Sequence, residues 1–435
     1  MSDLNSFILN VAESVRLQDG DRLKRYLTLY PRNEVPNGEI QAKFPDPNEF
    51  DLYQLNEKYH LVLKSHLKMM RAIYISKQIK LTFDELNDMT NHLIRAAEFE
   101  TNWINVVLIN CLTELLAVYR VRQQSYREEL VEYEEDNHQD LGKTKNLSSI
   151  EKLANTLNKA FKISLNDKSM ELNMSKRADI YYFLSQLIKI YYMMNKLDLA
   201  KSIEKAIKGT KFKLPNINKS ITNRKFGIVY LYYSAILALD DGDFKQAESK
   251  LDQSLLLISH LKNYQNSIQY EKILFILLPI RLYFGKKPKN TIWKYKSINI
   301  IYHDLTTAIL TGNIKKYDEI LIKYQIIFLK NHLYLLLEHL KQTVYTNLIK
   351  KITKIVQSQL KDSNHIIPLS SYQIGFEISK FQNFDQNFDW TTHDPYYTQE
   401  EIECIIANLI NNGKVKGYLS HGNRCLVLSK QNPFP

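Results

Sequence analysis

Few residues of this 435-residue chain have the types and spacing that catalysis or metal binding requires. Its 11 histidines never occur as His-x-His, and it has no HExxH, CxxC or GxGxxG motif and no GxxxxGK phosphate loop. His421 and Cys425 are four residues apart, but two ligands without further partners do not form a metal site. His393 and Asp394 precede Pro395, where we expect turn chemistry and not an acid–base pair. The sequence therefore predicts a protein that is not an enzyme and needs no metal or cofactor.

Basic residues are the ones that could bind a ligand. The chain has a formal net charge of +11, and residues 286–361 hold 14 lysines, no arginine and four acidic residues, a formal charge of +10. A local basic field favours a polyanionic partner, either nucleic acid or a strongly acidic protein. The alternative is that these lysines only solvate long helices.

The composition suits a mostly helical globular protein. Apolar residues make up 44% of the chain and charged residues 24%, with only 12 Gly and 11 Pro. Residues 1–15 carry acids and no basic n-region, so no secretory signal is expected, and the longest apolar run, 273–280, is too short to span a bilayer. The scattered Cys111, Cys404 and Cys425 favour a reducing compartment. We therefore expect a soluble intracellular protein with no membrane partner.

The C-terminal residues 395–435 open with a predicted helix. The hydroxyl of Thr398 and the carboxylates of Glu400 and Glu401 suit a helix N-terminus, and the residues 411–413 (Asn-Asn-Gly) suit its end. Apolar residues recur between them at helical spacing: Ile402, Ile405, Ile406 and Leu409.

A short basic β-hairpin follows this helix. We expect strands at 415–419 and 425–429, joined by a polar turn at 420–424. A helix followed by a two-stranded wing is the second half of a winged-helix domain, a module that docks on partners or nucleic acid. Residues 366–379 are predicted to form its first helix or helices, and residues 382–392 a polar insertion.

Helical periodicity dominates the rest of the chain. One helical stretch is expected at 48–77 and another at 83–124, which Thr82 and Glu85 open with capping-box spacing. The acid-rich residues 128–145 are expected to form a solvated helix end and a loop.

From residue 148 the predicted helices come in pairs. Helix 180–194 is followed by 197–207, and helix 226–239 by 244–258. The second pair resembles a tetratricopeptide unit, in which small residues let two antiparallel helices approach closely. The acidic residues 240–243 lack the ligand spacing of an EF-hand and are interpreted as an interhelical turn. Such pairs in register predict an α-solenoid.

Residues 302–354 continue this pattern and lead to a first resemblance. A helix should end at 311–313, a second should run from 314 to about 323, and a long one should end near 354. The string TAILTGNIKKYDEILIKY, between tetratricopeptide-like helices and a winged helix, resembles the PCI domain of scaffold subunits in the proteasome lid, the signalosome and translation initiation factor three. Its GN-x₃-Y element consists of Gly312, Asn313 and Tyr317.

The terminal string NLINNGKVKGYLSHGNRCLVLSKQNPFP is more specific. It resembles the Thp-type PCI family, which includes export-complex subunits and the signalosome-associated subunit numbered twelve. ETNWI (100–104) and SLND (164–167) also resemble that family, so the resemblance covers roughly residues 90–435. Residues 418–430 favour the signalosome-associated branch, whereas KQNPFP is close to the export branch.

The resemblance implies a mainly α chain in three parts. Residues 1–147 would be an N-terminal helical region. Residues 148–362 would be a solenoid of tetratricopeptide-like helix pairs, with the helical half of the PCI domain from about 221. Residues 363–435 would be the winged-helix half and a short tail.

The resemblance also implies a non-enzymatic adaptor in the nucleus, with the cytoplasm as a second location. Such proteins pair with a second PCI-domain protein of Thp/Sac type through their winged helices, and with a small acidic Sem/Dss-type subunit along the solenoid. Family members act in transcription-coupled mRNA maturation, in splicing or export, and one branch associates with the signalosome, which removes a ubiquitin-like modifier from cullins.

Two sets of site residues are expected. RNA or DNA contacts are assigned to the cations of the wing and of the helix before it: Lys350, Lys351, Lys354, Lys414, Lys416, Arg424 and Lys430. Tyr418, Leu419 and His421 are assigned to the PCI partner, because a wing with an edge strand can extend a partner's sheet. In the alternative, these cations face solvent or a protein, and the chain is a protein-only subunit associated with the signalosome.

Overall fold

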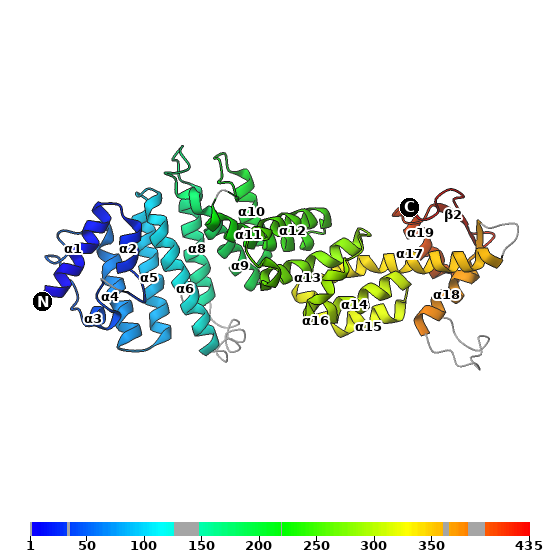
Figure 1. The fold of residues 1–435 in the computed structure, drawn as a ribbon, viewed down its shortest axis with the longest axis horizontal. Helices are drawn as coiled ribbons and strands as arrows, with labels where there is room; N and C mark the ends of the chain where they lie inside the picture. Colours follow the sequence, from blue (N-terminus) through cyan, green and yellow to red (C-terminus); the bar gives the residue numbers. More distant parts are fainter. Residues whose placement is uncertain (1, 33–34, 126–147, 219, 360–364, 382–395) are drawn as a thin grey trace, which may run out of the picture. The chain divides into compact units, whose positions relative to one another are not determined.

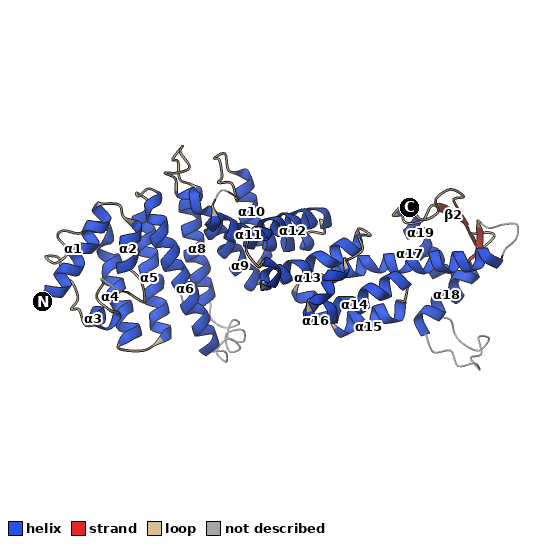
Figure 2. Ribbon diagram, in the orientation of Figure 1, coloured by secondary structure: helices blue, strands red, loops and turns tan. Residues whose placement is uncertain are grey.

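The computed structural model describes the following residues of the chain: 2–32, 35–125, 148–218, 220–359, 365–381 and 396–435. They form mostly helices, with a small three-stranded sheet near the C-terminus (Figure 2). The predicted fold class, mainly α with helix pairs and a C-terminal winged helix, is confirmed. The expected loop at 128–145 and insertion at 382–392 lie outside the described residues.

Contacts between residues divide the chain into two compact units, Met1–Tyr233 and Ser234–Pro435. The boundary falls inside helix α11 (Ile221–Asp240), which therefore contributes residues to both units. The three-part division at 147/148 and 362/363 remains a prediction from the sequence.

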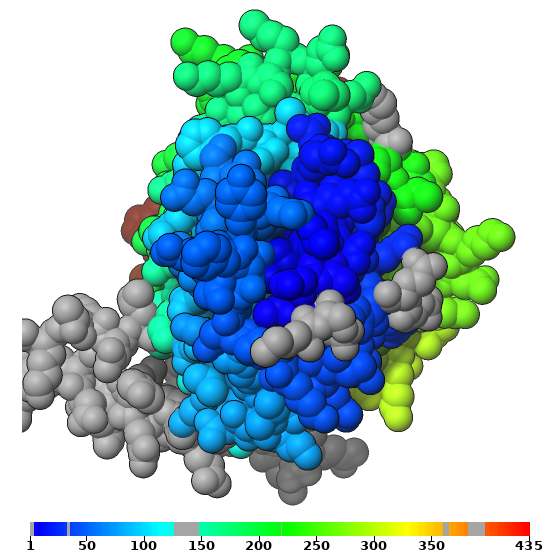
Figure 3. Space-filling view, turned by 90° about the vertical axis from the view of Figure 1, so that its left-hand side faces the viewer, coloured from blue at the N-terminus to red at the C-terminus, as the bar shows by residue number. Residues whose placement is uncertain are grey.

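The first unit consists of helices joined by short connections (Figure 1). Its α-helices before α11 are α1 (Ser2–Arg16), α2 (Gly20–Tyr26), α3 (Gly38–Ala42), α4 (His60–Tyr74), α5 (Ile79–Ala97), α6 (Asn105–Ser125), α8 (Ser149–Leu165), α9 (Ile180–Met193) and α10 (Leu197–Gly209). Its 3-10 turns are η1 (Glu57–Tyr59), η2 (Asn102–Ile104) and η4 (Lys176–Asp179). Figure 3 shows the N-terminal face of this unit, on which the residues of α1 appear in dark blue.

Two predicted helices of this unit are interrupted. The helix expected at 48–77 forms only as η1 and α4, and Phe50, which precedes them, is 91% exposed. The helix expected at 83–124 is α5 and α6 with a break at residues 98–101. Thr82 does not cap a helix, because α5 begins at Ile79 and the Thr82 hydroxyl donates to the carbonyl of Gln78. The apolar period was correct, but it does not mark where a helix is broken.

A buried lysine brings together the two stretches that resemble the family, 100–104 and 164–167. The ammonium group of Lys176 donates to the carbonyl oxygens of Ala97 (2.8 Å) and Glu100 (2.9 Å). The carboxylate of Asp167 accepts from the amide of Lys176 (2.7 Å), and the hydroxyl of Ser164 donates to its carbonyl (2.9 Å). Burial lowers the pKa of Lys176. Three segments are thus fixed to each other by a cation that the protein interior satisfies with carbonyls.

One described helical segment, Asn102–Ser125, is long and apolar enough to cross a membrane by length and composition. Cys111, Leu112 and Leu115 on it are fully buried in the first unit. A core helix has this same composition, and α6 packs against α5 and α8.

The second unit continues with helices and ends in the sheet (Figure 1). After α11 its α-helices are α12 (Phe244–Ser259), α13 (Ile268–Tyr283), α14 (Lys296–Thr311), α15 (Ile314–Lys323), α16 (Gln325–Lys330), α17 (Tyr334–Gln359), α18 (Leu369–Phe381) and α19 (Gln399–Asn411). Its 3-10 turns are η5 (Tyr264–Asn266) and η6 (Asn290–Lys294), and its strands are β1 (Ile366–Pro368), β2 (Gly417–Ser420) and β3 (Cys425–Leu428).

The predicted helix pairs are confirmed. α9 and α10 form the first pair, and α11 and α12 the second. The acidic residues 240–243 form the expected turn, in which Gly242 has φ +75° and the Asp243 side chain caps α12 by accepting from an amide 2.9 Å away. α14 ends at Gly312, and α15 runs from Ile314, as expected.

The winged helix also follows the prediction at its C-terminal end. The Thr398 hydroxyl accepts from the amide of Glu401 (3.2 Å), and the Glu401 carboxylate accepts from the amide of Thr398 (2.8 Å). This capping box opens α19, which ends before Gly413 (φ +68°). The hairpin β2–β3 is antiparallel and places Leu419 opposite Leu426.

The prediction was wrong for residues 366–368, which were expected to be helical. They form β1, which pairs antiparallel with β3 in the sheet order β1-β3-β2. Pro368 explains the difference, because a residue before proline is restricted to extended backbone and proline itself has no amide for a helix interior. α18 therefore begins only at Leu369.

Candidate partner-docking surfaces

A buried turn between α14 and α15 positions the winged helix. Gly312 ends α14 with φ +71°, and Asn313 caps α15 with its side chain. A Cβ at residue 312 would lie 2.7 Å from the amide nitrogen of Leu348 on α17, so only glycine fits. The fully buried Tyr317 donates its hydroxyl to the carbonyl of Leu337 (2.6 Å). The GN-x₃-Y element thus sets how α14, α15 and α17 meet.

Two carboxylates then fasten the helices of the winged-helix module. Asp318 on α15 binds the ammonium groups of Lys341 on α17 and Lys380 on α18, each at 2.7 Å. Burial alone would lower the pKa of both lysines, but the hydrogen bond to Asp318 raises it above the ordinary value. Glu377 on α18 accepts from the amide of Tyr397, just before α19 (2.6 Å). These bonds hold α15, α17, α18 and the start of α19 together.

The residues expected to bind a PCI partner lie on the wing. β2 is an edge strand of the sheet, and Tyr418 on it is 63% exposed. Leu419 is half-buried, opposite Leu426. The exposed His421, at the wing turn, lies 3.0 Å from the carboxylate of Glu403 on α19. Of the three, Tyr418 is therefore the large exposed side chain that is best placed to contact a partner.

The predicted cations do not form a single patch. Lys350 lies on α17 beneath the C-terminal tail, its ammonium nitrogen 5.8 Å from the centre of the Phe434 ring. The tail turns back on the wing, where the carbonyl of Pro433 accepts from the amide of Lys416 (2.8 Å). The side chains of Lys416 and Lys430 are exposed at this end of the hairpin. The exposed Lys354 lies one turn from Lys350 on α17.

Three other cations lie apart from that group. Lys351 reaches the carbonyl of Thr311 at the end of α14 (3.4 Å). Arg424, at the opposite end of the hairpin, donates to the side chain of Gln399 (3.0 Å). The half-buried Lys414 donates to the hydroxyl of Thr343 on α17 (3.0 Å).

Lys414 is the least accessible of these cations. Its ammonium nitrogen also lies 5.6 Å from the centre of the Tyr283 ring on α13, and burial lowers its pKa. It therefore fixes the wing to α13 and α17 as well as carrying charge.

A basic groove that sequence reasoning missed runs between α12, α13 and η6. We name it the lysine groove; it has a volume of about 460 Å³. Its cations are Arg281, Lys286, Lys287, Lys289 and Lys294, and its apolar residues are Leu255, Leu274, Leu277, Leu278, Pro288 and Ile292, with Tyr270 and Tyr295 beside them. The excess of lysine from residue 286 on indicated its charge. Its leucines (Leu255, Leu274, Leu277 and Leu278), which we call the leucine floor, come from α12 and α13.

Two cations of the lysine groove are available to a ligand. Arg281 is paired with Asp252 (2.7 Å) and Lys286 with Glu248 (2.6 Å), and Lys294 donates to the side chain of Gln265 (3.0 Å). Lys287 and Lys289 are exposed and make no ion pair with any residue that the structure describes. A ligand with carboxylates and apolar side chains matches this combination of charge and floor.

The geometry of the described residues offers no metal chemistry. No group of three or more His, Cys, Asp and Glu among them could hold an ion. His421 is exposed and faces Glu403, whereas Cys425 is buried. The pair that was four residues apart in sequence is therefore not one site.

Comparison with known proteins gives a consistent result. Residues 321–430 match the family described as the PCI domain. The chain is 46% identical over 437 residues to "Protein CSN12 homolog" of Debaryomyces hansenii, covering 99% of this chain and 98% of that one. It is 27% identical to "PCI domain-containing protein 2" of Danio rerio, covering 99% and 97%. It is 25% identical to "Cop9 signalosome complex subunit 12" of Saccharomyces cerevisiae, covering 90% of each chain.

Proposed function

Because the chain belongs to the family of the CSN12 homologues and is a PCI-domain protein, we propose that it is a non-catalytic scaffold subunit associated with a signalosome. The name of the Saccharomyces relative, a Cop9 signalosome subunit, supports this assignment. The structural observation that supports it most is the wing, in which the exposed Tyr418 lies on the edge strand β2.

The wing would bind a second PCI-domain protein, of the Thp/Sac type. The edge strand β2 can add a partner strand by main-chain hydrogen bonds. Tyr418 offers the large, partly apolar side chain that anchors an interface. Pairing with β3 orders this edge before the partner arrives, which reduces the ordering cost of binding.

The lysine groove would bind the small acidic subunit of Sem/Dss type. Lys287 and Lys289 supply unpaired positive charge, and the leucine floor accepts apolar side chains from an extended acidic chain. A Lys287→Glu/Lys289→Glu variant should lose that subunit and keep the PCI partner. Lys262→Glu/Lys272→Glu, which reverses two exposed lysines outside the groove, is the matched control.

Nucleic-acid binding in mRNA maturation is a second candidate function. It is favoured by Lys350, Lys354, Lys416 and Lys430, which are exposed and form no ion pair with a described residue. Cations grouped around the tail and the end of the hairpin could neutralise neighbouring phosphates. Arg424 and Lys351 would contribute less, because they lie elsewhere on the module.

Purification of the tagged chain followed by mass spectrometry tests the proposed scaffold. Signalosome subunits and a PCI partner should accompany the natural chain, and the Tyr418→Ala chain should lose the PCI partner. Recovery of splicing or export subunits, with no signalosome subunit, would replace the signalosome assignment with the mRNA one. Recovery of no PCI protein at all would contradict both.

A further inference from the structure

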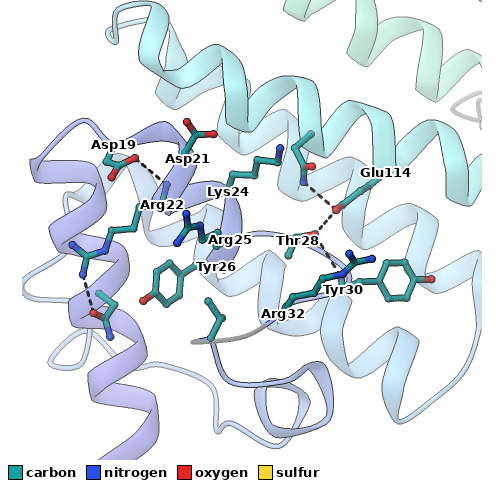
Figure 4. A pocket seen from close by; sticks show the side chains of 13 residues that line it. Asp19, Asp21, Arg22, Lys24, Arg25, Tyr26, Thr28, Tyr30, Arg32 and Glu114 are labelled. Atoms are coloured by element: carbon teal, nitrogen blue, oxygen red, sulfur yellow. Dashed lines mark hydrogen bonds between the residues drawn. The ribbon is translucent and has the colours of Figure 1, made fainter.

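A second polar site lies in the first unit, far in sequence from the PCI domain. α1, α2, the loop after α2 and α6 surround a cavity of about 1060 Å³, which we name the N-terminal cavity (Figure 4). Lys24 and Arg25 line it from α2, Tyr30 and Arg32 from the loop, and Glu114 from α6. Nothing in the proposed scaffold function uses this cavity.

The loop of the N-terminal cavity is fixed by a buried carboxylate. Glu114 accepts from the hydroxyl of Thr28 and from the amide of Leu29 (3.1 Å), and Asn110 donates to it as well (3.0 Å). The hydroxyl of Tyr74 donates to the carbonyl of Leu29 from the other side (3.0 Å). The start of this loop, at Thr28 and Leu29, is therefore held in one position before any ligand binds.

The acids around the N-terminal cavity form no ion pair with Lys24, Arg25 or Arg32. Burial raises the pKa of Glu114, whose oxygens are already used by the loop, although Lys24 is close enough to that carboxyl to lower its pKa in part. Asp19 accepts from the amide of Arg22 (2.9 Å), and the carboxylate of Asp21 points away from Arg25 in Figure 4. Arg22 is itself paired with Glu13 (2.6 Å) and belongs to the wall of the cavity.

Three cations of the N-terminal cavity remain available. Lys24, Arg25 and Arg32 make no ion pair with any described residue, and Figure 4 shows them around one space. Two of them are arginines, whose planar guanidinium groups match the oxygens of a phosphate in pairs. Unpaired cations from α2 and from the loop after it, around one space, indicate a site for an anion with more than one charged group.

An aromatic ring at the rim specifies the kind of anion. Tyr30 is 63% exposed and lies next to Arg32 in Figure 4. An exposed ring beside unpaired cations is the arrangement by which single strands are bound, with bases stacked on the ring and phosphates on the cations. The N-terminal cavity has no leucine floor like that of the lysine groove, so it offers less to the side chains of an acidic peptide.

We propose that the N-terminal cavity binds a single-stranded nucleic acid, with phosphates on Lys24, Arg25 and Arg32 and a base stacked on Tyr30. This site is independent of the cations of the winged helix. The proposal also stands apart from the scaffold function, because protein partners would occupy the wing and the lysine groove.

The first test measures binding of the full chain to a labelled oligouridine of about 12 nucleotides, by fluorescence anisotropy at several salt concentrations. The variant carries Lys24→Gln, Arg25→Gln and Arg32→Gln. Its affinity should fall at least about tenfold at low salt, and the slope of log affinity against log salt should decrease by about 2, since three phosphate contacts are lost. Circular dichroism should show unchanged helix content, because the three side chains are not in the core.

A matched control neutralises three exposed cations of the same unit outside the cavity: Lys43→Gln, Lys68→Gln and Arg95→Gln. It should keep the affinity of the natural chain. An equal loss in the control would show that only the overall charge matters and would overturn the proposal. A variant with Lys350→Gln, Lys354→Gln and Lys416→Gln distinguishes binding at the winged helix from binding at the N-terminal cavity. The oligouridine binding that this variant keeps should disappear when Lys24, Arg25 and Arg32 are neutralised as well.

The second test addresses Tyr30. Tyr30→Ala should weaken binding about fivefold or more at every salt concentration, whereas Tyr30→Phe should keep the affinity, because stacking needs the ring and not the hydroxyl. Polyglutamate of the same charge should displace the oligouridine only weakly. Equal displacement by polyglutamate, together with no effect of Tyr30→Ala, would identify the N-terminal cavity as a site for an acidic protein segment and overturn the nucleic-acid proposal.

Discussion

The hydroxyl of Ser379 on α18 donates a hydrogen bond of 2.8 Å to the carbonyl of Gly312 at the end of α14. The same hydroxyl accepts a bond of 2.9 Å from the amide of Ile314, the first residue of α15. One side chain thus completes both ends of the interhelical turn, and it does so from the winged helix. The two halves of the PCI domain are therefore joined where the buried carbonyl of Gly312 and the buried amide of Ile314 depend on Ser379 for a hydrogen bond.

Replacement of Ser379 by Ala should therefore destabilise the second unit. It leaves a buried carbonyl and a buried amide without partners, which should lower the free energy of unfolding by about 2–3 kcal/mol. Urea titration measures this free energy. Ser370→Ala, at an exposed position on the same helix, is the control, and its free energy of unfolding should stay within about 0.5 kcal/mol of that of the natural chain. Equal stability of the two variants would show that water replaces the Ser379 bonds.

Gly312→Ala and Gly242→Ala form a second comparison. Both glycines have positive φ, +71° and +75°, so both substitutions strain the backbone. Only residue 312 also meets a neighbour, the backbone of Leu348, whereas nothing lies within 4 Å of a Cβ at residue 242. We expect Gly242→Ala to cost about 1 kcal/mol and Gly312→Ala about 3 kcal/mol or more. Similar values for both would mean that α17 moves aside freely.

The stability of the first unit should depend on pH through His66. This side chain is fully buried, stacks on Phe7 and bonds Gln41 (2.8 Å), and burial lowers its pKa to about 3. In the unfolded chain the imidazole of His66 has a pKa near 6.5, so it binds a proton there before it does so in the folded protein as the pH falls. The contribution of neutral His66 is therefore complete above about pH 6.5 and falls by about 1.4 kcal/mol for each pH unit below it.

Urea titrations at pH 7.5 and 5.5 test this pH dependence. Unfolding of the His66→Gln chain should change less between these two values than unfolding of the natural chain. His260→Gln, at an exposed position, should behave as the natural chain does. The same pH dependence in both variants would place the titrating group elsewhere.

Tyr418→Ala separates binding from folding. Since this side chain is 63% exposed, the free energy of unfolding should change by less than about 0.5 kcal/mol. Affinity for the PCI partner should fall at least about 30-fold if Tyr418 anchors the interface. Isothermal titration with the purified partner measures it, and Tyr53→Ala, at another exposed tyrosine, is the control. An unchanged affinity would move the interface away from β2.

Charge reversal on α17 tests the nucleic-acid candidate at the winged helix. The variant changes Lys350, Lys351 and Lys354 to Glu and should weaken binding of single-stranded RNA equally for all sequences, because phosphate contacts position a protein without reading bases. Gel-shift titration at two salt concentrations should show that the slope of log affinity against log salt is smaller by about 1.4, because Lys350 and Lys354 are the two phosphate contacts expected on α17. The control reverses Lys245, Lys262 and Lys272. Unchanged binding in the α17 variant would show that α17 contacts no phosphate and would leave the N-terminal cavity as the site of any RNA binding.

Local signals in the sequence were enough for the helix pairs and for the wing. The capping box of Thr398 and Glu401 and the turn at Gly312 and Asn313 depend on residues a few positions apart, which the sequence displays directly. β1 was missed because its three residues become a strand only by pairing with β3, far along the chain. Periodicity alone could not place that contact.

The sites were predictable only in part, for the same reason. Lys414 and Lys416 look alike in sequence, but Thr343 and Tyr283, from two other helices, enclose Lys414 alone. The charge of residues 286–361 indicated an anionic partner, whereas the leucine floor of the lysine groove arises from α12 and α13. The cations of the N-terminal cavity gave no signal, because the acidic residues before and after them in sequence, Asp19, Asp21 and Glu34, nearly cancel their charge.

The sheet order β1-β3-β2 has a consequence for the route by which the wing forms. The two-stranded ribbon β2–β3 is joined by a short turn, so its strands can pair without the rest of the sheet. β1 lies far from β3 in sequence, so its pairing closes a long stretch of chain and adds a third strand to that ribbon. The entropy of such a closure grows only logarithmically, so that doubling the loop would cost about 0.6 kcal/mol. The chain between β1 and β3 can therefore change in length at little cost in stability while the strand order stays the same.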